Sequence, residues 1–406
     1  MNCYQDHCRN MRLLLLSVIS CLFINPVFAQ YQPPVFPLGE GPWQFDTYER
    51  QTRIQVSVLT RGLSHPWSMA WLPDGNMLIT ERGGALRYFK DGTLQPKPLA
   101  GLSDLGIDRF MDIAVHPAFR DNRFIYVTYL KRRPHPDGSN KYWATTVLAR
   151  GVFDGNSVKG VEEIFIADGW RDFFGGEASR LLFLPDGTLI MGSSHRRDLD
   201  GPQNLGNHVG KILRLRDDGS AAQDNPFIGR EGARPEIYSY GHRTMLGFAV
   251  HPQTGELWQT ENGPQGGDEV NIIRPGANYG WPLVTFGRDY NGTRVSESVW
   301  KEGIAMPELI WVPSVTTSGM IFYTGDRIPA WQGNLLLGSM MEGRLPGTGH
   351  LERIVFADNG GELRREALLT DLQQRIRDVR QGPDGRIYLL TEEAEAALLV
   401  IDQVGE

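Results

Sequence analysis

The chain has 406 residues and a formal net charge of −7 at pH 7. An acidic balance of this kind argues against nonspecific nucleic-acid binding, which needs a basic face. The hydrophobic content of 41% is too high for a disordered chain. The 47 glycines and 25 prolines follow no fixed period, which excludes collagen. The length suits two or three ordinary domains or one large β domain.

Residues 1–29 are expected to form a cleaved secretory signal peptide. Arg9 and Arg12 give the segment a positive start, residues 13–23 are mostly apolar, and residues 27–29 have the small-residue pattern of a cleavage site. The apolar run is too short to span a bilayer, so we expect no stable membrane anchor. All cysteines fall in this segment, which leaves the mature chain without disulfides or a thiol nucleophile. We therefore expect a periplasmic or secreted protein.

A strand, a tight turn and a second strand recur six times along the chain. Alternating apolar residues predict the strands, and Pro-Asp-Gly or similar turns between them are typical of hairpins. The units cover residues 67–82, 111–130, 179–195, 246–262, 318–340 and 378–393. Six units at similar intervals indicate an internal repeat.

The repeat predicts an all-β fold, a six-bladed β-propeller of four-stranded antiparallel sheets. One hairpin cannot bury both faces, whereas sheets packed radially around an axis cover one another and leave few edges. Six blades of roughly 60 residues need about 360 residues, which the chain after residue 29 provides. A sandwich or two separate β domains is the alternative, but no linker divides the chain. We expect residues 30–54 to be a lead-in and residues 55–406 to form the propeller.

Several common catalytic motifs are absent from the sequence. There is no G-x-S-x-G, no H-E-x-x-H and no phosphate-binding GxxxxGK[ST] sequence. No G-x-G-x-x-G sequence follows a strand and opens a helix, which argues against a Rossmann nicotinamide site. Functional residues are therefore expected in loops at one end of the propeller channel.

The most informative segment is LWQTENGPQGGDEVNIIRPGANYGWP at residues 257–282. Its glycine-rich turn brings backbone carbonyls and carboxylates together, and calcium prefers six to eight such oxygens. A polar turn capped by its own acidic residues would have the same composition. On chemistry alone, both interpretations stay open.

The same segment and its neighbours resemble the soluble PQQ-dependent sugar dehydrogenases of the glucose/sorbosone dehydrogenase family. The resemblance rests also on HVGKILRLRDDGS at 208–220, EIYSYGHR at 236–243 and QRIRDVRQGPDGRIYLLTE at 374–392. It extends from about residue 55 to the C-terminus. The family fold, a six-bladed propeller, agrees with the repeat count.

The resemblance implies an oxidoreductase that uses pyrroloquinoline quinone (PQQ) and Ca²⁺. In such enzymes calcium polarises the quinone, and a histidine base takes a proton from the anomeric hydroxyl of an aldose. Hydride moves to the quinone, the sugar becomes a lactone, and electrons leave to an external acceptor. Arginines bind the cofactor carboxylates.

The resemblance also implies roles for individual residues. Those matching the metal site are Gly263, Pro264, Glu269 and Tyr279. Those matching cofactor-binding positions are Arg243, Thr244, Tyr290, Arg375 and Arg377. The alternate spacing of the last two arginines places both on one face of a strand, as a carboxylate clamp requires.

Four positions depart from the family pattern. Allowing a two-residue insertion, Phe173 stands where the catalytic histidine is expected. Thr244 replaces an asparagine, Ile107 a cofactor-contacting glutamine, and Met341 a lysine.

His195 is the candidate for the missing base, because it ends the third hairpin. Glu177 or Asp172 would orient its imidazole, as carboxylates do in many sites. A loop histidine beside two arginines, with no catalytic role, is the alternative. Two other functions also remain: a propeller that has lost oxidation and only binds a sugar or another partner, and a calcium-dependent lactonase-type hydrolase.

Overall fold

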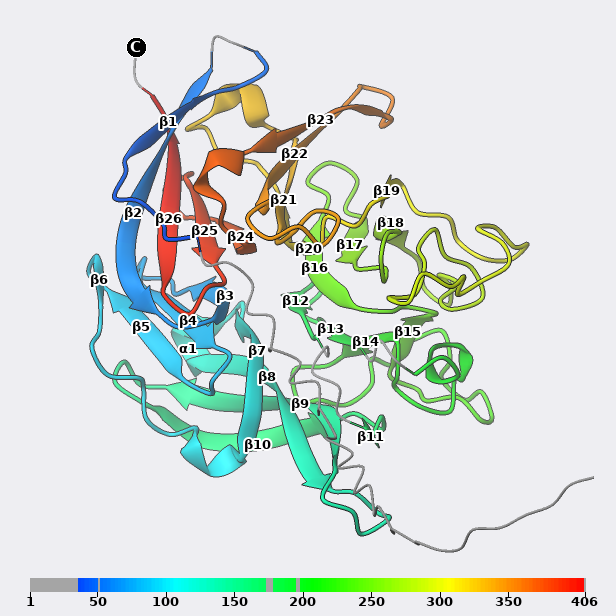
Figure 1. Ribbon diagram of the computed structural model, residues 1–406. Coiled ribbons are helices and arrows are strands. Elements are labelled where there is room, and N and C mark those ends of the chain that lie inside the picture. Colours follow the sequence, from blue (N-terminus) through cyan, green and yellow to red (C-terminus); the bar gives the residue numbers. More distant parts are fainter. Residues whose placement is uncertain (1–35, 50–51, 173–177, 195–197, 405–406) are drawn as a thin grey trace, which may run out of the picture. The chain divides into compact units, whose positions relative to one another are not determined.

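The computed structural model describes residues 36–49, 52–172, 178–194 and 198–404. Its strands form six antiparallel sheets around a central axis, which confirms the predicted six-bladed β-propeller (Figure 1). The six predicted hairpin units supply the two innermost strands of the six sheets. The expected signal peptide at 1–29 lies outside the described residues. Within the described ranges, no helix is long and apolar enough to cross a membrane.

The first three blades run outward from the axis through consecutive strands. Blade 1 contains β3 (Pro66–Trp71), β4 (Met77–Glu81), β5 (Leu86–Lys90) and β6 (Thr93–Leu94). Blade 2 contains β7 (Ile107–Val115), β8 (Phe124–Pro134), β9 (Tyr142–Phe153) and β10 (Val158–Ile166), with β11 (Arg171–Asp172) paired to β9. Blade 3 contains β12 (Leu181–Phe183), β13 (Leu189–Ser193), β14 (Lys211–Leu215) and β15 (Ile237–Tyr240).

The remaining blades include the one that closes the ring. Blade 4 contains β16 (Met245–Val250), β17 (Leu257–Glu261), β18 (Asp268–Ile273) and β19 (Leu309–Trp311). Blade 5 contains β20 (Thr317–Phe322), β21 (Leu335–Ser339), β22 (His350–Phe356) and β23 (Glu362–Leu368). Blade 6 contains β24 (Ile376–Gln381), β25 (Ile387–Thr391), β26 (Ala396–Gln403), β2 (Arg53–Leu63) and β1 (Trp43–Asp46). Because β2 pairs antiparallel with β26, strands from both ends of the chain complete one sheet.

Helical segments are short and lie between strands. They are α1 (Phe119–Asn122) and the 3₁₀ turns η1 (Ser103–Leu105), η2 (Gly201–Gln203), η3 (Pro329–Trp331) and η4 (Thr370–Leu372). The second strand of five blades, β4, β13, β17, β21 and β25, is buried along its whole length. Neighbouring blades cover both of its faces, so polar side chains in these strands must find partners inside the protein.

A buried ion network ties the innermost strands together at the axis. Arg180, which directly precedes β12 and is 1% exposed, lies 3.2 Å from Asp112 Oδ1 and 3.1 Å from Asp378 Oδ1 through its Nη1. Its Nε donates to the carbonyl of Leu246 at 2.6 Å, and its Nη2 to the carbonyl of Arg377 at 3.2 Å. One guanidinium thus joins blade 3 to blades 2, 4 and 6. It also fixes the backbone at the start of β24, where Arg377 lies and which Arg375 directly precedes.

We expect Arg180→Leu to lower the free energy of unfolding by about 3 kcal/mol, because Asp112 and Asp378 would lose one of the two guanidinium groups that they share, and only Arg380 would remain to pair with both. Urea unfolding measures the change. The control is Arg53→Leu, which removes an exposed pair with Asp46 and should cost under about 1 kcal/mol. An Arg180→Leu loss no larger than the control would show that the axial network does not stabilise the fold.

Candidate active site

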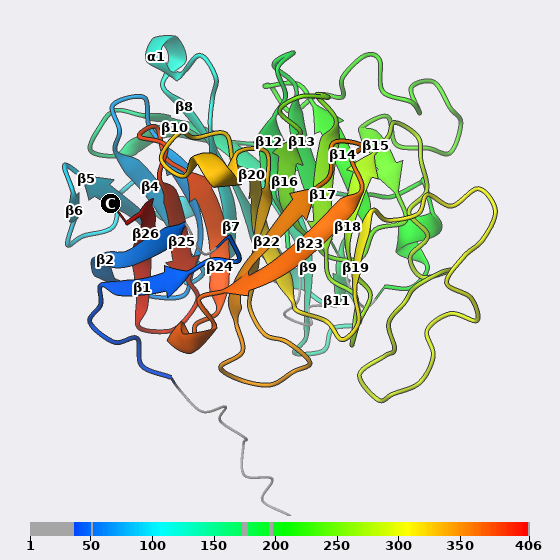
Figure 2. The ribbon, with the colours of Figure 1, turned by 90° about the horizontal axis from the view of Figure 1, so that it is seen from above.

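The segments that carry the candidate site lie at one end of the propeller. Figure 2 shows the loop 340–349, between β21 and β22, at the same end as part of the long segment 274–308 that joins β18 to β19. Arg375 and Arg377 stand at the start of β24, and Glu392 directly follows β25. These connections place charged side chains at the ends of the inner strands.

Three arginines converge on one buried carboxylate. Arg375 donates from Nε to Glu392 Oε2 at 2.7 Å, while Arg377 and Arg82 both donate from Nη2 to Glu392 Oε1. The Glu392 side chain is only 5% exposed. The two arginines predicted to form a clamp are therefore brought together, and Arg82, which follows β4 of the neighbouring blade, joins them.

Positive charge is concentrated at this cluster. Burial is the main reason that the pKa of Arg377 lies well below its usual value, and the neighbouring Arg82 and Arg375 lower it further. Burial together with the charges of Arg109 and Arg375 lowers the pKa of Arg82 to about 10. Close cations inside a protein repel one another. The cluster is therefore suited to receive an anion.

A buried apolar cluster adjoins the arginines. The Arg377 guanidinium lies 4.3 Å from the centre of the Trp67 ring, and that of Arg82 lies 5.7 Å from it. The Met340 thioether lies 3.9 Å from Arg375 Nη2. Six buried apolar side chains from blades 1 to 5 form one cluster here: Trp67, Met111, Leu130, Ala178, Leu246 and Met340. The arginine cluster thus borders a buried apolar cluster through Trp67 and Met340.

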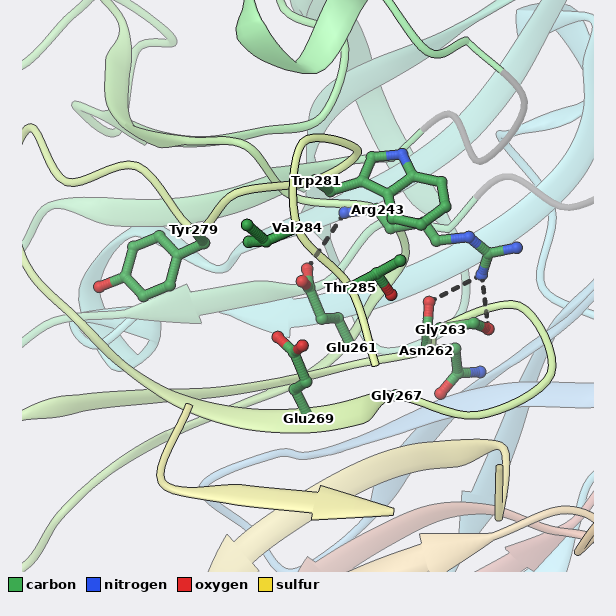
Figure 3. A pocket seen from close by; sticks show the side chains of 10 residues that line it. All are labelled: Arg243, Glu261, Asn262, Gly263, Gly267, Glu269, Tyr279, Trp281, Val284 and Thr285. Atoms are coloured by element: carbon green, nitrogen blue, oxygen red, sulfur yellow. Dashed lines mark hydrogen bonds between the residues drawn. The ribbon is translucent and has the colours of Figure 1, made fainter. Parts of the chain in front are cut away.

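Arg243 occupies a second part of the site, in blade 4. Its Nη1 donates to the carbonyls of Asn262 and Gly263 at 2.7 and 2.8 Å (Figure 3). Its Nη2 donates to the Tyr290 hydroxyl at 3.3 Å. Its guanidinium also lies 5.1 Å from the centre of the Trp281 ring. The structure thus brings Arg243, Gly263 and Tyr290, three predicted site residues, into contact. The adjacent Thr244 is buried, and its carbonyl accepts from the Asn262 N–H at 2.9 Å.

A small cavity of about 10 Å³ lies beside Arg243, and two buried carboxylates, those of Glu261 and Glu269, face each other across it (Figure 3). Burial raises the pKa of Glu269 well above its usual value, and the Glu261 charge raises it further. Gly263 and Tyr279 also line the cavity. The Tyr279 hydroxyl points away from the carboxylates and donates to the carbonyl of Ile272 at 2.6 Å.

The glycine-rich turn beside the cavity is tightly folded. A Cβ on Gly263 would lie 2.0 Å from the carbonyl oxygen of Gly266, so no larger residue fits at this position. Pro264 is buried within the same turn. Asp268 Oδ1 accepts the Gly263 N–H at 3.0 Å, and burial raises the pKa of Asp268 to about 6. The turn is therefore held by its own acid, as the simpler sequence interpretation requires, while it also borders the carboxylate cavity.

The predicted catalytic residues His195 and Glu177, like Phe173, lie outside the described residues. Asp172, the other carboxylate considered for orienting the base, is described. Its Oδ1 lies 2.9 Å from His135 Nε2 and accepts from Trp143 Nε1 at 3.1 Å.

Four residues of the site were not predicted. Glu261 lies within the 257–282 segment. Its position directly before the glycine-rich turn could have indicated from the sequence that it belongs to the site. Arg82 and Glu392 each lie at the end of an inner hairpin. They meet only because blades 1 and 6 are neighbours in the propeller. Arg344, from the loop 340–349, lies 5.5 Å from the centre of the Tyr290 ring, three residues after the position where the family lysine is missing.

Comparison with known proteins agrees with this architecture. The family described as Glucose / Sorbosone dehydrogenase matches residues 63–400. An aldose sugar dehydrogenase, YliI, of Escherichia coli is 38% identical over 362 residues, which cover 86% of this chain and 92% of the relative. Quinoprotein glucose dehydrogenase B of Acinetobacter calcoaceticus is 25% identical over 426 residues, covering 85% and 87%.

Solved structures share the fold. The soluble aldose sugar dehydrogenase of Escherichia coli in its apo form superimposes with a TM-score of 0.79 at 34% identity, covering 86% of this chain and all of that one. The PQQ-bound aldose sugar dehydrogenase of Streptomyces coelicolor has a TM-score of 0.64 at 23% identity, covering 86% and 98%. A family match that spans most of the propeller, together with relatives above 30% identity, settles the assignment: the chain belongs to the glucose/sorbosone dehydrogenase family.

Proposed function

We propose that the protein is an exported PQQ- and calcium-dependent oxidoreductase that oxidises aldose sugars to lactones and passes the electrons to an external acceptor. The observation that carries the proposal is the pair Arg375 and Arg377, held on one buried carboxylate beside a buried apolar cluster. When bound, PQQ supplies an ortho-quinone that accepts hydride from the sugar. The family and the PQQ-bound relative support this choice of cofactor.

The residues present fit a flat anion that carries several carboxylates. The Nε atoms of Arg82 and Arg377 are buried and have no hydrogen-bond partner among the described residues, so donors remain for a ligand. In this proposal Arg375 and Arg377 bind cofactor carboxylates, for which guanidinium groups are well shaped. Arg243, with Thr244 and Tyr290 beside it, would also hold the cofactor. The apolar cluster around Trp67 would limit the access of water to it.

The cavity between Glu261 and Glu269 fits a hard cation. Two carboxylates buried together repel each other, and a calcium ion would neutralise both. Gly263, Pro264 and Tyr279 belong to the proposed metal site by the family resemblance, and the Gly263 carbonyl already accepts a cationic donor, Arg243. We therefore propose that calcium binds at this turn and that its carbonyls and carboxylates contribute the ligands.

The proton acceptor remains a proposal from the sequence. Phe173 cannot accept a proton, and His195 is the imidazole at the end of the third hairpin unit in the sequence. We propose that a ring nitrogen of His195 takes the proton of the sugar hydroxyl and that Glu177 orients the ring.

The test of the function is reconstitution. The mature chain, supplied with PQQ and CaCl₂, should bind PQQ with a changed absorption spectrum and should reduce an artificial dye in the presence of an aldose. Binding of PQQ without dye reduction across a panel of aldoses would favour a propeller that only binds. Hydrolysis of lactones without PQQ would favour a hydrolase.

Calcium should stabilise the native state, because a ligand that binds only the folded protein raises its stability by mass action. Excess chelator should lower the melting temperature of the wild-type protein, as measured by calorimetry. Glu269→Gln should remove most of this response. Glu256→Gln, at an exposed turn between β16 and β17, is the control and should keep it. A wild-type melting temperature that is unchanged by excess chelator would rule out the proposed calcium site.

His195→Ala should reduce aldose turnover by about 10²–10⁴-fold, the usual contribution of a general base. PQQ affinity should change little, because the arginines that hold the cofactor remain. Steady-state dye reduction and PQQ titration measure the two effects. His251→Ala, in the turn after β16, is the matched control. Wild-type turnover in the His195→Ala protein would mean that another group is the base.

A further inference from the structure

Arg82 differs from the other two arginines of the cluster in its origin. It follows β4 in blade 1, whereas Arg375, Arg377 and Glu392 all belong to blade 6. Its side chain is 28% exposed, between the 4% of Arg377 and the 38% of Arg375. The Arg82 guanidinium therefore reaches across the boundary between two blades to Glu392 and stays partly exposed to solvent.

Among the described residues at this boundary, cationic side chains outnumber anionic ones. Both oxygens of Glu392 are engaged, Oε1 by two arginines and Oε2 by the third. Glu393 is the other acid nearby, and its Oε1 accepts the backbone N–H of Arg375 at 2.9 Å. Within the part of the chain that the structure describes, three guanidinium groups thus face two carboxylates. A second anion would relieve the repulsion that remains.

The surroundings define the kind of anion that fits. Arg82 and Arg377 both lie near the Trp67 ring, whose Nε1 is buried and has no hydrogen-bond partner among the described residues. The Nε atoms of the same two arginines are buried and lack partners in that part of the chain. Several inward donors next to an aromatic ring suit a planar aromatic carboxylate better than a small inorganic anion.

We propose that Arg82 is a third carboxylate-binding arginine of the cofactor site, and that Glu392 is a positioning residue that holds all three guanidinium groups in place while leaving the cluster short of negative charge. The inference rests on the proposed use of PQQ. Glu392 acts through the arginines and does not touch the cofactor. Its negative charge has two opposite effects: it stabilises the ligand-free cluster, and it weakens the attraction of the cluster for an anionic ligand.

The two roles predict changes of opposite sign. Arg82→Gln should weaken PQQ binding by roughly tenfold to a hundredfold, the usual effect of losing one charge-assisted contact. Glu392→Gln should lower the melting temperature of the ligand-free protein, yet PQQ should raise the melting temperature of this variant by more degrees than that of the wild type. Arg87→Gln is the matched control, because Arg87 pairs with Glu81 at 3.0 Å in the same blade but lies outside the cluster. It should bind PQQ as the wild type does.

PQQ titration by absorbance and thermal shift, both without sugar, measures these effects independently of turnover. PQQ affinity in Arg82→Gln equal to that of the wild type would overturn the role of Arg82. A thermal shift in Glu392→Gln no larger than in the wild type would overturn the role of Glu392. A wild-type protein that binds no PQQ would overturn the proposed function along with this inference. If Arg82→Gln does not fold, Arg82→Lys keeps the charge but loses the fork of donors, and unchanged affinity in that variant would equally contradict the proposal.

Discussion

The contact of Arg180 with Asp112 and Asp378 is the interaction on which the arrangement of this propeller depends. One guanidinium at the axis holds inner strands from several blades, and a buried ion network of this kind tolerates little displacement because each unpaired charge would be costly. Blade 5 packs against the same point. A Cβ on Gly319 of β20 would lie 2.1 Å from Asp378 Oδ1, so close approach of the two blades requires glycine there.

The axial network and the candidate site are built from consecutive residues. Asp378 pairs with Arg180 in the interior. The carbonyl of Arg377 accepts a hydrogen bond from Arg180, and the Arg377 side chain donates one to Glu392. The backbone that carries Arg377 is therefore already held by Arg180. Arginines that repel one another can be kept in one place because the strand bearing two of them cannot move away, which is the preorganisation that a binding site for a charged ligand needs.

The sequence predicted the features that local chemistry determines. Hairpin periodicity and turn residues lie within a few positions of each other, so the sequence predicted the six inner hairpins and the propeller. The spacing of Arg375 and Arg377 likewise predicted that both side chains lie on one face. The partners across blades were not predicted. Arg82 meets Glu392 only because blade 1 lies beside blade 6, and Glu261 faces Glu269 only because β17 pairs with β18 in the observed register. The direction of the Tyr279 hydroxyl depends on packing that no spacing in the chain reveals.

In the loop after β21, the residue at one family position is replaced, and a nearby residue still brings a positive charge to the site. Met341 stands where a lysine is expected, and its neighbour Met340 joins the apolar cluster and contacts Arg375 through its thioether. Three residues later, Arg344 adopts a left-handed backbone conformation with φ 66° and places its guanidinium against the Tyr290 ring, whose hydroxyl accepts from Arg243. Non-glycine residues take this conformation at a cost in free energy, and such strain persists where surrounding contacts compensate it. The same loop thus supplies an apolar contact to one arginine group and a cation to the other, which links the two halves of the site.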